Sequence, residues 1–193
     1  MTQPPKILAF AGALRKDSSN KKVVRVAAEG ARKAGAIVTV IDLKDYPLPV
    51  YDGDIESNEG FPENVTKLQK LMLENDGFLI ASPEYNSSVS GALKNMIDWT
   101  SRANGDIAGL AVFSGKVASI MSASPGKLGG LRGLFDIRKI LSMIGVIVLP
   151  AQIAVSGSYQ AFDDDGNFKD EIMQENVERL GANVAEMLIK LNK

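Results

Sequence analysis

The sequence contains neither cysteine nor histidine, and these two absences exclude much of the usual enzyme chemistry. Without cysteine there is no disulfide, no thiol nucleophile and no thiolate ligand for an iron–sulfur cluster. Without histidine there is no serine–histidine–aspartate triad and no Cys/His zinc site, so we predict no metal site. If the chain is an enzyme, a bound cofactor has to supply the reactive group.

An excess of charge of one sign is also missing, because 22 Lys and Arg residues nearly balance 23 Asp and Glu residues. The net charge of −1 leaves no basic footprint of the kind found in nucleic-acid-binding proteins, so we expect no nucleic-acid partner. No apolar run approaches the roughly 18 residues of a membrane-spanning helix, so we expect no membrane partner. We therefore expect a cytoplasmic protein, and the lack of cysteine agrees with this location.

Strand-like and helix-like patterns alternate along all 193 residues, which we interpret as a single domain, 1–193. Apolar or β-branched runs predict five strands, at 6–12, 37–43, 77–82, 116–124 and 146–150. Stretches with helical spacing separate these strands, and a long one ends the chain. Five strands alternating with five helices predict an α/β fold with three layers, in which a doubly wound parallel sheet is covered on both faces.

Ligands of doubly wound sheets bind at the carboxyl ends of the strands, so the loops there are the candidate site. The loop after the first strand carries Arg15, Ser18, Ser19 and Asn20 and leads into a helix. Free N–H groups at a helix N-terminus, hydroxyl groups and a guanidinium together suit a phosphate monoester. Ser and Asn are equally favoured as plain helix caps, and this loop alone favours that simpler interpretation.

Two further loops hold unusual residues at the same side of the predicted sheet. Pro83, Glu84, Tyr85 and Asn86 directly follow the third strand, where backbone N–H groups and an aromatic ring suit a planar heterocycle. An ordinary turn, followed by a helix capped by Ser90, explains this loop equally well.

The loop after the fourth strand contains Ser122, Ser124 and Gly126. Its glycines allow the backbone to approach a flat ligand closely, although a flexible turn is the simpler explanation for this loop alone.

Taken together, the segments GALRKDSSN at 12–20, PEYNSSVSGALKNMIDW at 83–99 and SASPGKLGG at 122–130 resemble the NADPH-dependent FMN reductase family. That family includes bacterial quinone, chromate and azo-dye reductases. The resemblance implies a flavodoxin-like fold with strand order 2-1-3-4-5, FMN as cofactor, and NADPH or NADH as co-substrate. It also implies a small-molecule electron acceptor, such as a quinone, free flavin, chromate or an azo compound, and a homodimer or homotetramer.

The resemblance further implies roles for individual residues. It puts Arg15, Ser18 and Asn20 around the FMN phosphate, at the helix start that also contains Ser19. It puts Pro83, Glu84, Tyr85 and Asn86 along the isoalloxazine and ribityl region, and Ser122, Ser124 and Gly126 on the other side of the flavin. Hydride transfer between two heterocycles needs no protein nucleophile, so we predict no catalytic side chain.

Two residues depart from the family pattern. Ala13 stands where serine is common, which removes one hydroxyl contact to phosphate. Ser90 stands where proline is common, which is expected to loosen the loop before the following helix, since proline would pre-set the first turn.

Two other functions fit the same order of elements. One is a flavodoxin-like electron carrier without enzymatic activity, although such carriers tend to be strongly acidic and this chain is not. The other is an α/β binding domain whose loops only cap helices. The segment around 46–61 contains three aromatic residues, Tyr46, Tyr51 and Phe61, which either contribute to an interface or cover the sheet edge in the monomer.

Overall fold

The structure, a computed structural model, describes residues 3–191 and contains the predicted five-stranded sheet. Its strands are β1 (Lys6–Ala11), β2 (Ile37–Asp42), β3 (Gly77–Ala81), β6 (Val117–Ala123) and β7 (Ile147–Val155). All neighbouring strands are parallel, in the order β2-β1-β3-β6-β7. Because β6 and β7 are the fourth and fifth predicted strands, the predicted order 2-1-3-4-5 is confirmed.

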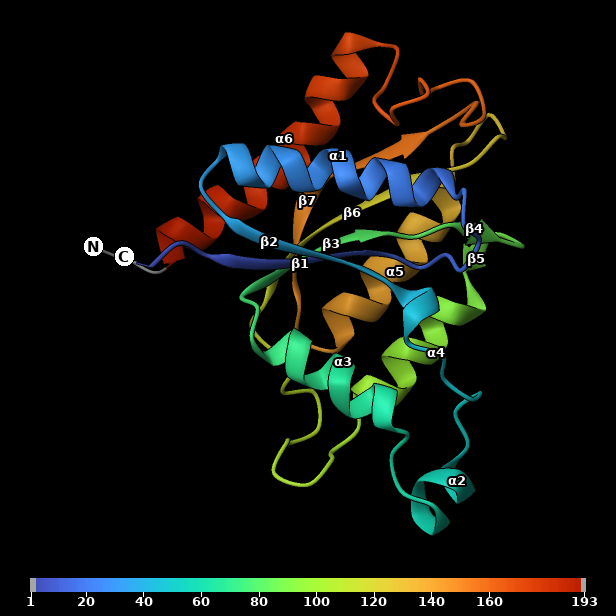
Figure 1. Cartoon of the computed structure of the whole chain (residues 1–193), viewed down its shortest axis with the longest axis vertical. Helices are drawn as coiled ribbons and strands as arrows, with labels where there is room; N and C mark the ends of the chain where they lie inside the picture. The colour runs from blue at the N-terminus through green and yellow to red at the C-terminus, as the bar shows by residue number, and fades with distance from the viewer. Residues whose placement is uncertain (1–2, 192–193) are drawn as a thin grey trace.

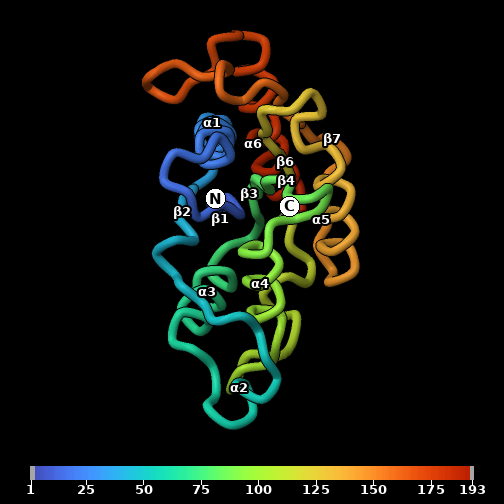
Figure 2. The backbone as a smooth tube through the Cα atoms, turned by 90° about the vertical axis from the view of Figure 1, so that its right-hand side faces the viewer, coloured from blue at the N-terminus to red at the C-terminus, as the bar shows by residue number. Residues whose placement is uncertain are grey.

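Helices cover both faces of this sheet (Figure 1; Figure 2). One face carries α1 (Ser19–Lys33) and α6 (Glu171–Leu191). The other carries α3 (Glu63–Leu73), α4 (Gly91–Thr100) and α5 (Leu131–Met143). Two separate clusters of buried apolar side chains fill the spaces between the sheet and the two helical layers, which confirms the three-layer architecture.

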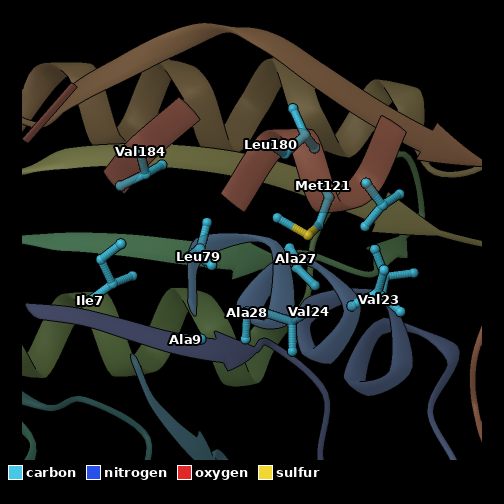
Figure 3. Packing of buried hydrophobic residues seen from close by; sticks show 14 of the residues in the cluster. Ile7, Ala9, Val23, Val24, Ala27, Ala28, Leu79, Met121, Leu180 and Val184 are labelled. Atoms are coloured by element: carbon cyan, nitrogen blue, oxygen red, sulfur yellow. The ribbon is translucent and has the colours of Figure 1, made fainter. Parts of the chain in front are cut away.

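The central strands supply both clusters because successive side chains point to opposite faces. Ile7 and Ala9 of β1 pack toward α1 and α6, together with Leu79 of β3 (Figure 3). Leu8 and Phe10 of β1 pack toward the helices of the other face. This burial on both sides explains why β1 and β3 are continuous apolar runs in the sequence.

Glycine brings α1 and α6 into backbone contact. A Cβ atom on Gly30 would lie 1.9 Å from the carbonyl oxygen of Glu178, and one on Gly181 would lie 1.8 Å from that of Ala27. No side chain larger than hydrogen fits at either position, so these two residues fix how closely the helices cross. Within residues 3–191, neither the 21-residue α6 nor any other helix is long and apolar enough to cross a membrane.

The last strand is longer than predicted. The predicted strand ends at 150, but β7 continues to Val155 through an irregularity in its pairing with β6. Ala118 pairs with Val148 and Ile120 pairs with Gln152, so three residues of β7 lie opposite one of β6. Proline is tolerated at such a bulge on an edge strand. As a result, the loop that follows Val155 reaches the same side of the sheet as the other strand ends.

The structure adds elements that the sequence did not predict: a short helix η1 (Leu43–Asp45), α2 (Gly53–Asn58) and a hairpin of β4 (Glu84–Tyr85) and β5 (Ser88–Val89). Residues 46–62, which we call the strap, run from η1 past α4 and include α2 (Figure 2). Tyr51 and Phe61 of the strap pack edge-to-face on the buried Trp99, with ring centroids 5.0 and 5.9 Å away. In the monomer these two aromatic residues therefore cover α4.

Candidate functional site

The loops after β1, β3, β6 and β7 enclose a cavity of about 390 Å³ at the carboxyl ends of the strands. We call it the edge cavity. Its lining residues are Arg15, Ser18, Ser19, Asn20, Pro83, Glu84, Tyr85, Ala123, Ser124, Pro125, Ser158 and Tyr159. The fold thus brings together most of the predicted site residues, and only Asn86, Ser122 and Gly126 do not line this cavity.

The N-terminus of α1 forms one end of the edge cavity. Ser18 is the N-cap, and its Oγ accepts a hydrogen bond from the Asn20 N–H at 3.3 Å. The first turn of α1 contains no acidic residue, so no carboxylate within that turn offsets the positive end of the helix dipole. The exposed Arg15 adds a guanidinium at the rim. This end of the cavity is therefore suited to an anion such as a phosphate group.

Asn20 has a structural task that the sequence did not reveal. Its Nδ2 donates to the carbonyl oxygen of Ala123 at 2.8 Å, and its Oδ1 accepts from the Ala123 N–H at 3.0 Å. The side chain is buried, so this pair of hydrogen bonds ties the start of α1 to the end of β6. The contact predicted between Asn20 and the phosphate stays a prediction, but the structure gives this side chain a role in setting the width of the cavity.

The hairpin of β4 and β5 forms the second wall. Asn86 and Ser87 have φ angles of +52° and +66°, as the central residues of a type I′ turn do. Asn86 therefore lies at the tip of the hairpin, and at this residue the loop is the ordinary turn that was the alternative to a ligand contact. Tyr85 stands beside the cavity with 57% of its surface exposed.

Glu84 anchors this hairpin to α5. Its Oε2 accepts a hydrogen bond from the Gly133 N–H at 3.1 Å, in the first turn of α5. The N-cap of α5 is Gly130, which has no side chain to satisfy that turn. The hydroxyl of Ser87 also accepts from Arg132 at 2.7 Å. The Glu84 carboxylate thus acts as a cap from outside the helix and holds the backbone of the second wall in place.

The loop after β6 forms the third wall, and Ser122 lies beneath it. Ser122 is fully buried, and within residues 3–191 its hydroxyl has no hydrogen-bond partner. A Cβ atom on Gly130, which has a φ of +94°, would lie 1.9 Å from that hydroxyl, so only glycine fits. Gly126 contributes through its backbone, because its N–H donates to Ser124 Oγ at 3.3 Å.

Ser158 and Tyr159 line the edge cavity but were not predicted. Ser158 is buried and its N–H donates to the carbonyl oxygen of Ser124 at 3.2 Å, which links this loop to the third wall. The sequence signal was available, because the apolar pattern of β7 resumes after Pro150. A prediction that extended the strand to Val155 would have placed the following loop, with Ser158 and Tyr159, at the site.

The two departures from the family pattern have structural explanations. Ala13 is only 3% exposed and belongs to the core beneath α1, so it packs rather than lining the cavity. Ser90 is the N-cap of α4: its Oγ accepts from the Leu93 N–H at 3.2 Å and donates to the carbonyl oxygen of Gly12. Proline has no hydroxyl to make these bonds, so Ser90 fastens the loop that it was expected to loosen.

An ion pair fastens α1 to the neighbouring strand end. Lys21 Nζ lies 2.5 Å from Asp42 Oδ2, and the lysine side chain is only 8% exposed. Burial raises the pKa of Asp42, but the hydrogen bonds from Lys21 and from the Lys44 N–H, with the Lys21 charge, bring it below its ordinary value. Asp42 is therefore charged at neutral pH and holds the β2 end against α1.

Comparisons with known proteins agree with this geometry. The family model of the NADPH-dependent FMN reductases matches residues 5–160. A probable NADPH:quinone oxidoreductase 2 of Oryza sativa is 31% identical over 96% of this chain and 90% of its own. An NAD(P)H-dependent FMN reductase of Pseudomonas aeruginosa is 33% identical over 93% of this chain and 92% of its own.

Solved structures show the same arrangement. The flavoenzyme NAD(P)H:(acceptor) oxidoreductase of Paracoccus denitrificans superposes with a TM-score of 0.81 at 26% identity, covering 96% of this chain and 98% of that one. An archaeal flavodoxin superposes with a TM-score of 0.60 at 12% identity over 94% of this chain and 97% of that one, which shows the flavodoxin-like fold alone. From its sequence, its fold and the loops that converge on the edge cavity, the chain belongs to the NADPH-dependent FMN reductase family.

Proposed function

We propose that this protein is an FMN-dependent reductase that oxidises NAD(P)H and passes the electrons to quinones or similar small acceptors. The observation that carries the proposal is the edge cavity, in which an anion-binding helix end and the Pro83–Tyr85 wall meet. Its volume of about 390 Å³ lies within the range of roughly 300–1,000 Å³ that is usual for small-molecule sites.

The donor set at the start of α1 fits the phosphate of FMN. The fork of Arg15, the hydroxyls of Ser18 and Ser19 and the first N–H groups of the helix would hold it. Asn20 would contribute by holding the Ala123 backbone, in addition to the contact predicted for it. One end of the cavity would thus recognise charge, and the opposite end would be free to recognise a ring.

The remaining walls fit a flat heterocycle. Pro83, Glu84 and Tyr85 would border the ring on one side and Ser124 on the other. For Asn86, Ser122 and Gly126, which do not line the cavity, we propose a role in shaping the loops that do.

FMN, when bound, supplies hydride and electron transfer, and the chain supplies position. Glu84 keeps the second wall rigid, because its carboxylate is committed to the N-terminus of α5. Tyr85 and Tyr159, which are 57% and 70% exposed, stand beside the open side of the cavity, where NADPH or NADH and then an acceptor would have to enter.

The enzymatic function is favoured over that of a non-enzymatic electron carrier. A net charge of −1 supplies little of the long-range attraction that steers a carrier to its protein partner. The relatives of this chain are named as oxidoreductases and reductases, and they match nearly its whole length.

A direct experiment separates these functions. The purified protein is saturated with FMN, and NADPH oxidation is followed with 1,4-benzoquinone as the acceptor and no protein partner. We expect a yellow protein and many turnovers per flavin. A protein that binds FMN but turns over hardly at all would be a carrier, and a colourless protein that cannot be reconstituted with FMN would contradict both functions.

The proposal includes a homodimer or homotetramer in the cytoplasm, as the family resemblance and the composition lead us to expect. Light scattering on a size-exclusion column would measure the mass of the particle against the 20.7 kDa of one chain. A particle of one chain mass at micromolar concentration would contradict the proposed assembly.

A further inference from the structure

The structure contains a second cavity, of about 380 Å³, between the strap and the start of α4. We call it the strap cavity. Among its lining residues, Leu43, Leu68 and Met96 are at most 4% exposed and belong to the core beneath the sheet. Leu14, which is 49% exposed, also lines it. The cavity is therefore an apolar recess that extends from the surface into the core.

Hydrogen bonds hold the strap wall of this cavity in place. The carbonyl oxygen of Pro47 accepts from Asn64 Nδ2 at 3.0 Å. The carbonyl oxygen of Pro49 accepts from Asn95 Nδ2 at 2.8 Å and from Trp99 Nε1 at 2.9 Å. A wall that is fastened at both prolines resists collapse onto the apolar floor, so the recess is preformed.

The strap cavity offers few polar groups to a ligand. Asn95 lines it, but its Nδ2 donates to Pro49 and its Oδ1 accepts from the Tyr51 N–H at 2.8 Å. Lys44 and Tyr46 are the other polar lining residues. A charged or strongly hydrogen-bonding ligand would lose more contacts with water than it gained here, so the recess suits an apolar group.

The two cavities share one loop. Leu14 lines the strap cavity and the next residue, Arg15, lines the edge cavity, and neighbouring Cα atoms are about 3.8 Å apart. Ser90 fastens α4 to the same loop through the carbonyl oxygen of Gly12, two residues before Ala92, which lines the strap cavity. The two cavities therefore border the same loop, with Leu14 at the strap cavity and Arg15 at the edge cavity.

We propose that the strap cavity binds the apolar substituent of the electron acceptor, so that this protein prefers quinones with a hydrocarbon side chain over unsubstituted ones. The inference rests on the proposed function, because the reducible ring has to lie at the edge cavity while its side chain lies in the strap cavity. It adds a substrate class to that function, namely alkylated quinones that are sparingly soluble in water.

The test uses the FMN-loaded protein and a series of 2-alkyl-1,4-benzoquinones with methyl, propyl and pentyl groups. Moving one methylene group out of water is expected to lower KM about fourfold, until the recess is full. kcat should change little, because the ring itself is the same. Pentylbenzene, which cannot be reduced, should bind with an affinity that saturation-transfer NMR detects.

Two variants and a matched control locate the effect. Ala92→Phe fills the strap cavity and should abolish both the dependence of KM on chain length and the binding of pentylbenzene. Leu48→Ala, on the strap, removes apolar wall and should raise KM for the pentyl compound more than for the methyl compound. Ala103→Phe adds the same ring at an exposed loop position outside both cavities and should behave like the parent protein.

The outcomes distinguish this inference from the function on which it rests. If quinones are reduced but KM is independent of chain length, or Ala92→Phe leaves that dependence intact, the assignment of the strap cavity is wrong and the reductase function stands. If no quinone in the series is reduced, the quinone-reductase activity in the proposed function is wrong and the substrate assignment falls with it.

Discussion

Individual side chains in this protein serve the site by holding its walls rather than by reaching into it. Asn20 binds both backbone polar groups of Ala123, and Glu84 binds the Gly133 N–H. The sequence suggests both polar side chains as ligand contacts, but in the structure both are hydrogen-bonded to the protein backbone. The reason is geometric. Loops from separate strands meet here, beyond the end of the strand pairing, so side chains have to satisfy their backbone donors and acceptors.

Replacing Asn20 should show how much the site depends on this bridge. Asn20→Ala leaves two buried backbone groups of Ala123 without partners, at about 1–3 kcal/mol each. We expect the free energy of unfolding in urea to fall by roughly 2–4 kcal/mol and the dissociation constant for FMN to rise. Asn58→Ala, an exposed residue of α2, is the matched control and should change neither quantity. An unaltered stability for Asn20→Ala would mean that the bridge is not formed.

Two variants of Asn86 distinguish a role in the turn from a direct contact with the cofactor. Asn86→Gly keeps a residue that accepts positive φ but removes the amide, so stability and FMN affinity should stay close to those of the parent. Asn86→Val forces a β-branched residue into the same conformation and should cost about 1–2 kcal/mol of stability. Titration with FMN measures the affinity of both variants. A clearly weaker FMN affinity in Asn86→Gly, whose turn is preserved, would favour direct contact by the amide.

Among the elements, the crossing of α1 and α6 depends most strictly on residue size. Both helices carry a glycine at the point of closest approach, and the carbonyl oxygens of the partner helix occupy the space of the missing Cβ atoms. Because α1 also forms the anion-binding end of the edge cavity, a shift of α1 on the sheet would move the site.

Gly181→Ala should therefore be severely destabilising. The added methyl group would lie 1.8 Å from the carbonyl oxygen of Ala27, which requires the helices to separate along their length. We expect a loss of more than about 3 kcal/mol, or failure to fold, as judged by urea unfolding. Gly53→Ala, at the start of α2 with open space around it, should be neutral or slightly stabilising. Equal stability of both variants would contradict the close crossing.

For the protein as a whole, the absence of histidine predicts that the free energy of unfolding changes little with pH near neutrality. The carboxyl pKa of Asp42 lies below its ordinary value, and so does that of Glu178, chiefly through its hydrogen bond from Lys33. A carboxyl group whose pKa is lowered by folding stabilises the protein above its ordinary pKa, and this contribution is lost as the pH falls through the lowered value. No histidine or cysteine titrates between about pH 6 and 8.

We therefore expect the free energy of unfolding to be nearly constant from about pH 6 to 8 and to fall below about pH 5. Asp42→Asn should lower it by about 1 kcal/mol at pH 7, since a third of the Asp42 side chain is exposed and solvent screens the pair. The variant should also lose less stability on acidification than the parent. Urea titrations at pH 7, 5 and 3.5 measure both effects, with the exposed Asp106→Asn as control. A parent curve with a steep change near pH 6.5 would contradict this account.

Much of this architecture can be read from local pattern. Five apolar strands, the helical stripes between them and the polar loops at their carboxyl ends follow from burial on both faces of a parallel sheet, which leaves a strong periodic signal. The strand order and most residues of the edge cavity followed from the three loop segments and their family resemblance, since parallel strands bring those loops to one edge.

Other features depend on contacts between residues distant in the chain, and local pattern encodes them only in part, as in the apolar residues that resume after Pro150. β7 continues past Pro150, and at this irregular stretch Arg138 of α5 donates to the carbonyl oxygens of Val148 and Leu149, at 3.3 and 2.9 Å. That continuation brings Ser158 and Tyr159 to the site. Asn20 is hydrogen-bonded to Ala123, which lies 103 residues later in the sequence. The strap encloses a second cavity against α4. A polar group pairs with whichever donor or acceptor the folded chain places beside it, and periodicity carries no information about that neighbour.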